Sequence, residues 1–449
     1  MGPDRRVYAD GAVAIEGRKI AAIGRTEEVL AKYAGKQRTE VDARRRIVMP
    51  GLIDGHFHPF NFLVGGHGDD LEIGDLLYKV FYPFEKSVTD EDARLGAMAG
   101  FVEMIKSGVT TFNDPGGYKP DLIARAAAEI GIRGIVARST RDLPPPGKAD
   151  TGLYDNTDTA LAEAERLVQT WNEPADGRLR AWCALRVSYE VSDRLVEGIR
   201  DLARKYSVGV HAHASSLPFE NRACESIFKK RAIPRYRDLG VLGPNFYAVH
   251  MGDLTTEEID ITREFDVKVS HCPVASLTGG WGIIKSKTIP NLIKAGVTVS
   301  LGTDTNFGSG SMDFFRVMFT FATAHRETHD DPTLVGAHKA LASATIEGAR
   351  ACLWDDEIGS LEVGKCADII MLGNDDWQWR YPGRDVARNI VYGGNAACVN
   401  SSWINGKLVM CDRKVLTIDE RALQESVEAT SRTLAERTGF KPRHIWPLG

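Results

Sequence analysis

Short apolar stretches with β-strand character recur along the middle of the chain, and each has a helical stretch nearby. Strands that alternate with amphipathic helices are typical of a parallel sheet. Eight such strands predict a parallel β/α barrel, in which the active site lies at the carboxyl ends of the strands. The predicted strands are residues 47–58, 109–114, 132–139, 179–187, 207–213, 245–252, 267–273 and 297–305.

The two ends of the chain show a different pattern. Residues 12–24 alternate around Gly17, and residues 399–411 do so around an Asn405-Gly406 turn, so both segments predict β-hairpins. We therefore expect an α/β fold in which a (β/α)8 TIM barrel carries a small β-sandwich domain built from both chain ends. The predicted division is residues 1–47 and 366–415 for the β-sandwich domain, 48–365 for the barrel and 416–449 for a helical tail.

Composition excludes several functional classes. The 449 residues are 43% hydrophobic and 26% charged, with a net charge of −5 and no basic stripe, so no nucleic-acid partner is expected. No apolar run reaches the roughly 18 residues of a membrane span, and the first residues lack the apolar core of a signal peptide. The seven cysteines are scattered without a CxxC pair, which favours reduced thiols and a cytoplasmic location.

Residues that can bind a metal gather at the ends of the predicted strands. In the stretch DGHFHPF, His56 and His58 lie two residues apart at the end of an apolar strand, so both imidazoles project to the same side. Two such nitrogens suit one divalent ion. Further candidates end later strands: His211 or His213, His250, His271 and Asp304.

These motifs together resemble the amidohydrolase superfamily of metal-dependent hydrolases. The resemblance includes PGLIDGHFHPF, VGVHAHAS, VSHCP, LGTDTNFGS and the run from Gly359 to Asp368, which matches the form G-x-[IL]-x-x-G-K-x-A-D. It spans nearly the whole chain. The most similar branch contains cytosine, adenosine-analogue and guanine deaminases together with triazine and phenylurea hydrolases.

The resemblance implies a set of metal ligands and catalytic residues. His250 would position the water and carry protons, His271 would lie beside the substrate, and Asp304 would act both as ligand and as proton acceptor. The fourth predicted strand ends without the lysine that bridges two metals in binuclear members, so one divalent metal is expected. Zinc is the first choice, and iron, manganese or cobalt suit the same ligands. The implied ligands are His56, His58, His213 and Asp304.

Two positions depart from the deaminase pattern. The ring deaminases of this branch carry a glutamate three residues after the ligand of the fifth strand, and this chain has Ser216 there. Many of them also have a Pro-His pair on the fourth strand, where this chain has Leu185-Arg186. Serine has no useful acidity near neutral pH and cannot protonate a ring nitrogen as that glutamate does.

Two hypotheses account for the missing acid. In the first, which we prefer at this stage, the substrate is an amide, urea or carbamate whose carbonyl needs no ring protonation, and the enzyme cleaves a non-peptide C–N bond. In the alternative, the chain is a deaminase or dechlorinase of a nitrogen heterocycle with a displaced general acid, for which Glu190 and Glu220 are candidates. We expect both glutamates to be solvated loop residues. A non-enzymatic scaffold protein is disfavoured because all four implied ligands are present.

The remaining expectations concern the pocket and the partners. The aromatic residues Phe60, Phe62, Trp281 and Phe307 are expected in loops around a largely apolar or aryl small-molecule substrate. His211 is expected to be packed or hydrogen-bonded, and a homo-oligomer is expected. The predicted substrate-binding residues are Ser216, Arg186, Trp281 and Phe60. The histidines expected at the surface are His325, His329, His338 and His444.

Overall fold

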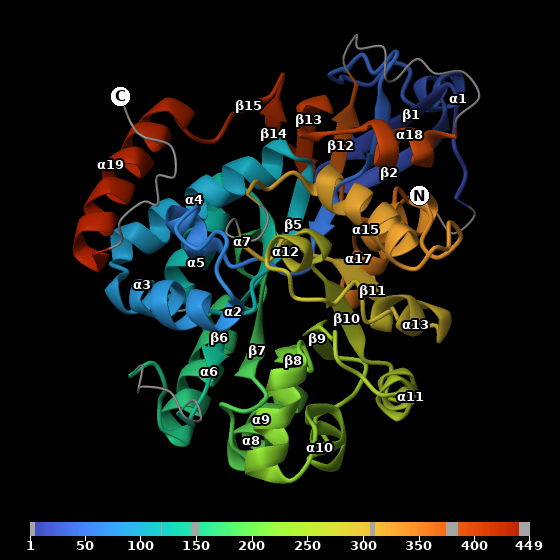
Figure 1. Cartoon of the computed structure of the whole chain (residues 1–449). Helices are drawn as coiled ribbons and strands as arrows, with labels where there is room; N and C mark the ends of the chain where they lie inside the picture. Colours follow the sequence, from blue (N-terminus) through green and yellow to red (C-terminus); the bar gives the residue numbers. More distant parts are fainter. Residues whose placement is uncertain (1–4, 118, 145–151, 306–309, 374–384, 440–449) are drawn as a thin grey trace, which may run out of the picture.

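An eight-stranded parallel barrel forms the centre of the molecule (Figure 1). The computed structural model describes residues 5–117, 119–144, 152–305, 310–373 and 385–439. The strands follow one another around the barrel in chain order, so every predicted barrel strand is present. They are β4 (Leu52–Asp54), β5 (Val109–Asn113), β6 (Arg133–Thr140), β7 (Leu179–Val187), β8 (Val210–Ala214), β9 (Phe246–His250), β10 (Lys268–His271) and β11 (Val299–Leu301).

The barrel closes where the last strand meets the first. Beyond β11 the backbone N–H of Asp304 donates to the carbonyl of His56, and the N–H of His58 donates to the carbonyl of Asp304, both at 2.8 Å. Gly302 permits this approach, because a Cβ there would lie 2.8 Å from the Cβ of His56. Closure therefore brings three predicted site residues together.

Both chain ends contribute to a smaller antiparallel β region beside the barrel. The five-stranded sheet has the order β15-β14-β13-β12-β3, and the hairpin β1-β2 turns at Gly17, whose φ is +58°. A bridge between Lys19 and Cys366 joins the hairpin to the segment before β12. These strands are β1 (Gly11–Glu16), β2 (Lys19–Arg25), β3 (Ile47–Pro50), β12 (Ile369–Leu372), β13 (Val399–Ile404), β14 (Lys407–Cys411) and β15 (Lys414–Val415).

The predicted strand over residues 47–58 divides in two. Residues before Gly51 form β3, which pairs with β12 of the small sheet, whereas residues after it form β4 of the barrel. A side chain at Gly51 would meet Thr110, since a Cβ there would lie 2.1 Å from the Thr110 Oγ1 atom. The two sheets thus share one continuous segment, and the small sheet extends to Pro50.

A buried ion pair also joins the two β regions. The Arg133 guanidinium on β6 donates to both carboxylate oxygens of Asp368, at 2.6 and 3.1 Å, and to Asn405 Oδ1 at 3.2 Å. Asp368 and Asn405 belong to the segments that frame β12 and β13. Removing either charge would leave the other buried and unpaired, which is strongly destabilising.

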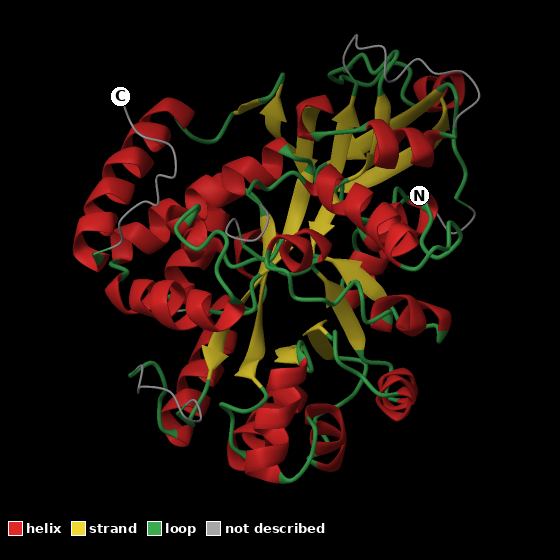
Figure 2. Ribbon diagram, in the orientation of Figure 1, coloured by secondary structure: helices red, strands yellow, loops and turns green. Residues whose placement is uncertain are grey.

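Helices surround the strands, as Figure 2 shows. The C-terminal helix α19, predicted as a helical tail, packs on α4, with ion pairs between Lys106 and Glu420 and between Arg437 and Asp92.

The helices after the barrel strands and in their loops are α4 (Asp90–Lys106), α5 (Pro120–Ile130), α6 (Thr157–Trp171), α7 (Pro174–Gly177), α8 (Asp193–Tyr206), α9 (Pro218–Phe228), α10 (Ala232–Asp238), α11 (Thr256–Glu264), α12 (Pro273–Thr278), α13 (Thr288–Lys294), α15 (Phe314–Thr328), α16 (Ala337–Ser343) and α17 (Ile346–Ala351). The others are α1 (Thr26–Lys32), η1 (Pro59–Val64), α2 (Ile73–Asp75), the π-helix η2 (Leu76–Phe81), α3 (Tyr82–Ser87), α18 (Val386–Gly393), η4 (Ala396–Cys398) and α19 (Glu420–Thr438).

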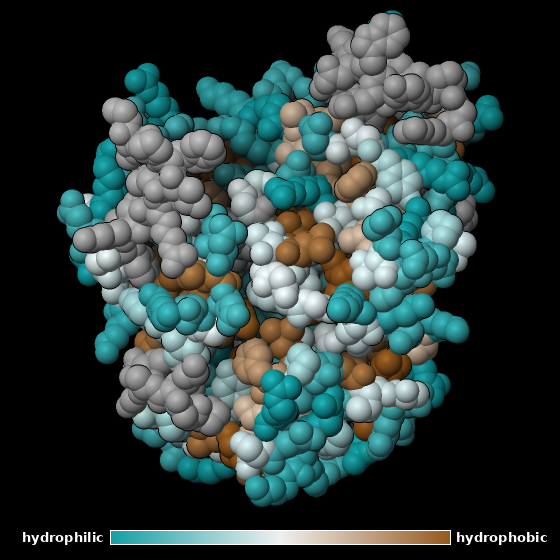
Figure 3. All heavy atoms as spheres, in the orientation of Figure 1, coloured by the Kyte–Doolittle hydropathy of each residue, from teal (hydrophilic) through white to brown (hydrophobic). Residues whose placement is uncertain are grey.

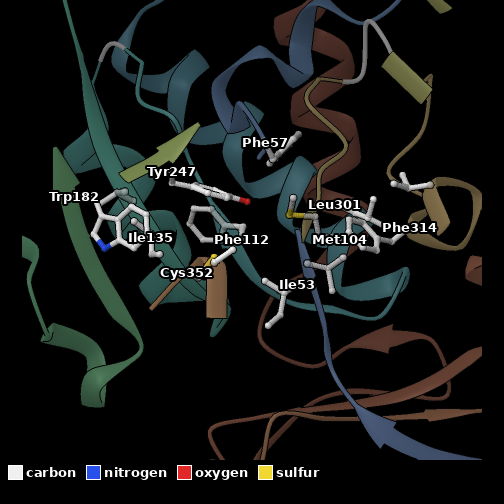
Figure 4. Packing of buried hydrophobic residues seen from close by; sticks show 14 of the residues in the cluster. Ile53, Phe57, Met104, Phe112, Ile135, Trp182, Tyr247, Leu301, Phe314 and Cys352 are labelled. Atoms are coloured by element: carbon white, nitrogen blue, oxygen red, sulfur yellow. The ribbon is translucent and has the colours of Figure 1, made fainter. Parts of the chain in front are cut away.

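The barrel interior below the site is filled by large apolar side chains. Figure 4 shows Phe57, Phe112 and Tyr247 among the side chains of this cluster, and each is fully buried. The Tyr247 hydroxyl is paired with Ser300 Oγ at 2.5 Å, so its polar end is satisfied. The barrel is therefore a packed support for the loops above it. Among the described residues, no helix combines the length and the apolar character that crossing a membrane requires.

Candidate metal centre and substrate pocket

The two histidines of the DGHFHPF motif lie directly after β4 and are buried. Asp54 at the end of β4 accepts hydrogen bonds from the backbone N–H of His56 at 3.2 Å and from the Thr303 hydroxyl at 2.5 Å. Burial raises the pKa of Asp54 to about 7. This carboxyl group therefore fixes the His56 backbone against the segment that carries Asp304.

The structure brings together the four side chains predicted as metal ligands. The ligand atoms of His56, His58 and His213 lie within 4.8 Å of one another. Asp304 Oδ1 lies 3.6 Å from His56 Nε2 and 3.9 Å from His58 Nε2. Ligand atoms around a tetrahedral ion with bonds of about 2.1 Å lie roughly 3.4 Å apart, so these separations suit one ion.

The chemistry of the donor set also fits a metal. His56 Nε2, the atom that faces Asp304, is buried and has no hydrogen-bond partner among the described residues. Burial lowers the pKa of His56 to about 3 and holds the pKa values of His58 and His213 well below their usual range. Neutral imidazoles with free lone pairs beside a carboxylate are the ligands that zinc and related divalent ions take.

His211 orients His56 rather than joining the cluster. The Asn113 amide directs its nitrogen at Cys352 Sγ, so its oxygen faces His211 Nδ1 at 3.0 Å and accepts a hydrogen bond from it. His211 Nε2 is then an acceptor, and His56 Nδ1 donates to it at 3.1 Å. This row fixes the tautomer of His56 that leaves Nε2 free for a metal. Hydrogen bonding of His211 was expected, but the role of Asn113 was not.

His250 and Asp304 lie beside each other in strained backbone conformations. His250 Nε2 is 3.8 Å from Asp304 Oδ2, and both residues have positive φ angles, +73° and +71°. Left-handed backbone is uncommon for residues other than glycine and often marks functional sites. Burial lowers the pKa of His250 to about 4, while the negative charge of Asp304 opposes the shift.

His271 ends β10 as predicted, and it contacts a histidine that we expected at the surface. His325 on α15 is fully buried, and its Nε2 lies 3.3 Å from His271 Nε2. The surface prediction for His325 is wrong, because the residue lies on the inward face of α15 beside Phe321. His329 is partly buried and lies 2.9 Å from the Ile284 carbonyl, while His338 is exposed and paired with Asp385. His444 lies outside the described residues.

A pocket with mostly apolar walls opens on the cluster. His58, His213, His250 and Asp304 line it together with three of the four predicted substrate-binding residues, Arg186, Ser216 and Trp281. Its apolar lining includes Leu71, Ile73, Leu76, Leu77, Phe81, Val187, Leu217, Phe219 and Ala275. Figure 3 shows apolar side chains near the middle of the visible face, ringed by hydrophilic ones.

The four aromatic residues predicted around the pocket lie in different parts of the structure. Trp281 lines the pocket with its ring 5.3 Å from that of His250. Phe60 is fully buried one layer behind the wall, where it stacks on Phe84 with ring centroids 6.2 Å apart, so it does not reach the pocket. The reason is local: η1 starts at Pro59 and turns Phe60 into the core. Phe62 lines a neighbouring surface pocket, and Phe307 lies outside the described residues.

Neither candidate for the displaced acid is the solvated loop residue that we expected. Glu220 and Glu190 are 2% and 0% exposed. Glu220 lies at the start of α9 and accepts from Ser216 N–H and the Ser188 hydroxyl, both at 2.7 Å, so its oxygens are occupied. Glu190 pairs with Arg141 at 3.2 Å and does not line the pocket.

Comparison with known proteins identifies the family. The model of the amidohydrolase family matches residues 47–409. The chain belongs to the amidohydrolase family. Residues 11–35 also match the imidazolonepropionase-like composite domain of bacteria.

Amidohydrolases that act on adenosine analogues are similar to this chain over nearly its whole length. The 5-methylthioadenosine/S-adenosylhomocysteine deaminase of Thermoanaerobacter pseudethanolicus is 30% identical over 444 residues, covering 97% of each chain. The 5'-deoxyadenosine deaminase of Methanosarcina barkeri is 31% identical over 439 residues, covering 97% of this chain and 96% of its own. An adenosine deaminase from Xanthomonas campestris, solved with bound zinc, superposes with a TM-score of 0.87 at 27% identity, covering 97% of this chain and 95% of its own. This chain is thus a metal-dependent amidohydrolase that cleaves non-peptide C–N bonds.

Proposed function

We propose that this amidohydrolase is an aminohydrolase that releases ammonia from an amino group on a planar nitrogen heterocycle of the adenosine-analogue class. The observation that carries the proposal is the four-ligand cluster at the bottom of an apolar pocket, with Asp304 and His250 side by side on its wall. The printed activities of the similar amidohydrolases support this class of substrate. An adenosine-analogue substrate therefore replaces the amide, urea or carbamate substrate as our first choice.

The proposed ligands of the single metal are His56, His58, His213 and Asp304. A bound divalent ion supplies water with a pKa near 7 instead of 15.7, so that hydroxide is present at neutral pH. Zinc is the first metal to test, because the Xanthomonas adenosine deaminase binds it.

Two side chains of this protein would move the protons. Asp304 accepts the proton that the water loses as its oxygen bonds to the ring carbon. His250, 3.8 Å from that carboxylate, carries the proton to the exocyclic nitrogen, which leaves as ammonia. His271 ends the strand β10, but it is fully buried and is not among the residues that line the pocket.

One observation favours the second candidate, hydrolysis of an amide, urea or carbamate. Ser216 occupies the position where the ring deaminases carry a glutamate, and the nearby Glu220 carboxylate is held by backbone and hydroxyl donors. A carbonyl substrate needs no acid at this position. The apolar lining suits an aryl group on such a substrate.

The experiment is a paired substrate screen on zinc-loaded protein. Ammonia release is measured with 5'-deoxyadenosine, methylthioadenosine, S-adenosylhomocysteine and adenosine, and C–N hydrolysis is measured with an anilide, a phenylurea and a carbamate. We expect ammonia release, its loss on treatment with a chelator and its return with zinc. Turnover of the carbonyl compounds alone would overturn the proposal in favour of the second candidate.

Two further expectations stay proposals. A homo-oligomer would give a mass above 49.3 kDa in light scattering, which a monomer would not. A cytoplasmic location would be tested by fractionation of the native cell. Neither changes the chemistry proposed for the pocket.

A further inference from the structure

Arg186 is a buried cation on the pocket wall. It lies near the end of β7, where the following residue, Val187, pairs with His213 of β8. Only 4% of Arg186 is exposed, and it lines the pocket together with His58 and His213. A charged side chain buried next to metal ligands calls for an explanation, because its positive charge repels a divalent ion.

A row of buried charges holds the guanidinium in place. Its Nη2 atom donates to Glu85 Oε1 at 3.3 Å, and Glu85 also pairs with Arg141, which pairs with Glu190. The guanidinium also lies over the ring of Phe81, with its carbon 5.2 Å from the centroid. Two cations and two anions keep the row neutral, so Arg186 stays charged and fixed in direction.

A buried donor atom of Arg186 has no partner. Nη1 is buried and has no hydrogen-bond partner among the described residues, although its neighbour Nη2 is paired. Buried N–H groups are nearly always paired, and a charged one without a partner is costly. Because Arg186 lines the pocket together with His58 and His213, this donor is suited to an acceptor on the substrate.

We propose that Arg186 is a catalytic residue whose Nη1–H donates to the ring nitrogen next to the attacked carbon and stabilises the negative charge that develops there. The inference rests on the proposed aminohydrolase function. It assigns to Arg186 the stabilising role that the missing glutamate plays in ring deaminases. The substrate class is accordingly a heterocycle with a C=N bond at the amino-bearing carbon.

The step balances without proton donation by arginine. Water oxygen bonds to the carbon, and the electron pair of the C=N π bond moves to the ring nitrogen, where Nη1–H holds it. One water proton ends on the exocyclic nitrogen, which departs as ammonia. The second water proton ends on the ring nitrogen as the C=O bond forms. Arg186 is protonated throughout, since a guanidinium does not lose its proton in proteins.

Glu85 is a positioning residue in this scheme. It contacts Arg186 through one carboxylate oxygen and Arg141 through the other, and it is not among the pocket-lining residues. Glu85→Gln should therefore lower kcat through Arg186 while the metal content is unchanged. Because the amide is neutral, the variant also leaves the row with excess positive charge, so folding is checked by circular dichroism.

The experiment combines substitution with chemical rescue. Arg186→Ala and Arg186→Lys, zinc-loaded and checked for zinc content and melting temperature, are assayed on 5'-deoxyadenosine and on 4-nitroacetanilide. We expect kcat to fall about 10²–10³-fold, as for loss of one transition-state donor, with KM changing much less. Added guanidinium should restore part of the activity of Arg186→Ala. It should not rescue His250→Ala, the matched control.

Two results would overturn the inference: a kcat within about threefold of the wild type in Arg186→Ala, or a loss that guanidinium does not restore despite full zinc content. If the wild type hydrolyses the anilide but releases no ammonia, the proposed function fails, and the inference fails with it, because an anilide has no ring nitrogen at the attacked carbon. If neither compound reacts, the affinity of the protein for benzoate is measured instead. It should be at least about tenfold weaker in the neutral double variant Arg186→Met/Glu85→Gln, and equal affinity would count against the inference.

Discussion

The metal centre and the pocket wall beside it use charge in opposite ways. The centre consists of neutral histidines around a single carboxylate, Asp304, and its ligand atoms form two overlapping groups of three, His56-His58-His213 and His56-His250-Asp304, each within 4.8 Å. Behind the wall, Arg186 belongs to a row with Glu85, Arg141 and Glu190 in which opposite charges are paired, and its buried Nη1 atom has no hydrogen-bond partner among the described residues.

The difference separates two properties of the enzyme. The centre determines that water attacks, because any amidohydrolase needs a metal and a proton acceptor for that step. The wall determines which atom of the substrate is stabilised as charge develops. Of the departures from the deaminase pattern, Arg186 and Ser216 lie in the wall and none is a proposed metal ligand, so we expect the reaction type to be retained while the substrate differs.

The largest effect should come from a ligand of the centre. His213→Ala should abolish zinc binding and reduce turnover below detection, since three remaining ligands bind the ion too weakly and misplace the water. Zinc content by elemental analysis, together with the ammonia assay, checks this. Full zinc occupancy in the variant would show that His213 is not a ligand.

Loss of proton transfer should be nearly as severe. His250→Ala should lower kcat about 10²–10⁴-fold while zinc stays bound, because His250 approaches Asp304 but is not among the four proposed ligands. Asp304 would then have no partner to pass the proton to. The check is steady-state kinetics on the best substrate at matched zinc content. An unchanged kcat would mean that another residue, such as His271, carries the proton.

A smaller effect is expected one layer behind the centre. His211→Ala removes the acceptor of His56 Nδ1, so His56 can take either tautomer and its orientation is no longer fixed. Disturbing such a partner typically lowers metal affinity or activity about 10–100-fold. Zinc affinity measured by competition with a chelator tests this. If His211→Ala lost zinc entirely while His213→Ala kept it, the assignment of the two histidines would be reversed.

The sequence predicts the centre well for a physical reason. Strand ends meet at one edge of a parallel barrel, so residues far apart in the chain, such as His56 and Asp304, can be placed together once the strands are recognised. Asn113 could have been found in the same way, because it ends the second barrel strand. The contact of His325 with His271 could not have been predicted, because the pattern of its helix does not show that His325 lies on the inward face.

The wall was much harder to predict because its contacts cross between loops. Glu220 looks like a surface residue in the sequence, yet α9 turns its carboxylate back onto the backbone of Ser216. Glu85 comes from α3, far along the chain from Arg186, and no spacing rule connects them. The division of the strand at Gly51 was missed because an apolar run does not reveal which of two sheets it joins.

The smallest effect should come from Ser216, the position where the wall departs from the ring deaminases. Ser216 contributes its backbone N–H to Glu220, and the described contacts include no hydrogen bond from its hydroxyl. Ser216→Ala keeps the backbone contact, so we expect a cost of at most 0.5–1.5 kcal/mol, roughly the net value of one hydrogen bond. The measurement is kcat/KM of the variant on the best substrate, with His250→Ala as the reference for a large loss.

Ser216→Glu sharpens the same comparison. A carboxylate at this position would lie in the same pocket as Arg186 and beside Glu220, so it should pair with the guanidinium and withdraw Nη1 from the substrate. We therefore expect Ser216→Glu to lower turnover far more than Ser216→Ala does. An increase in ammonia release instead would show that the wall accepts the acid of the ring deaminases, and that Arg186 does not take its place.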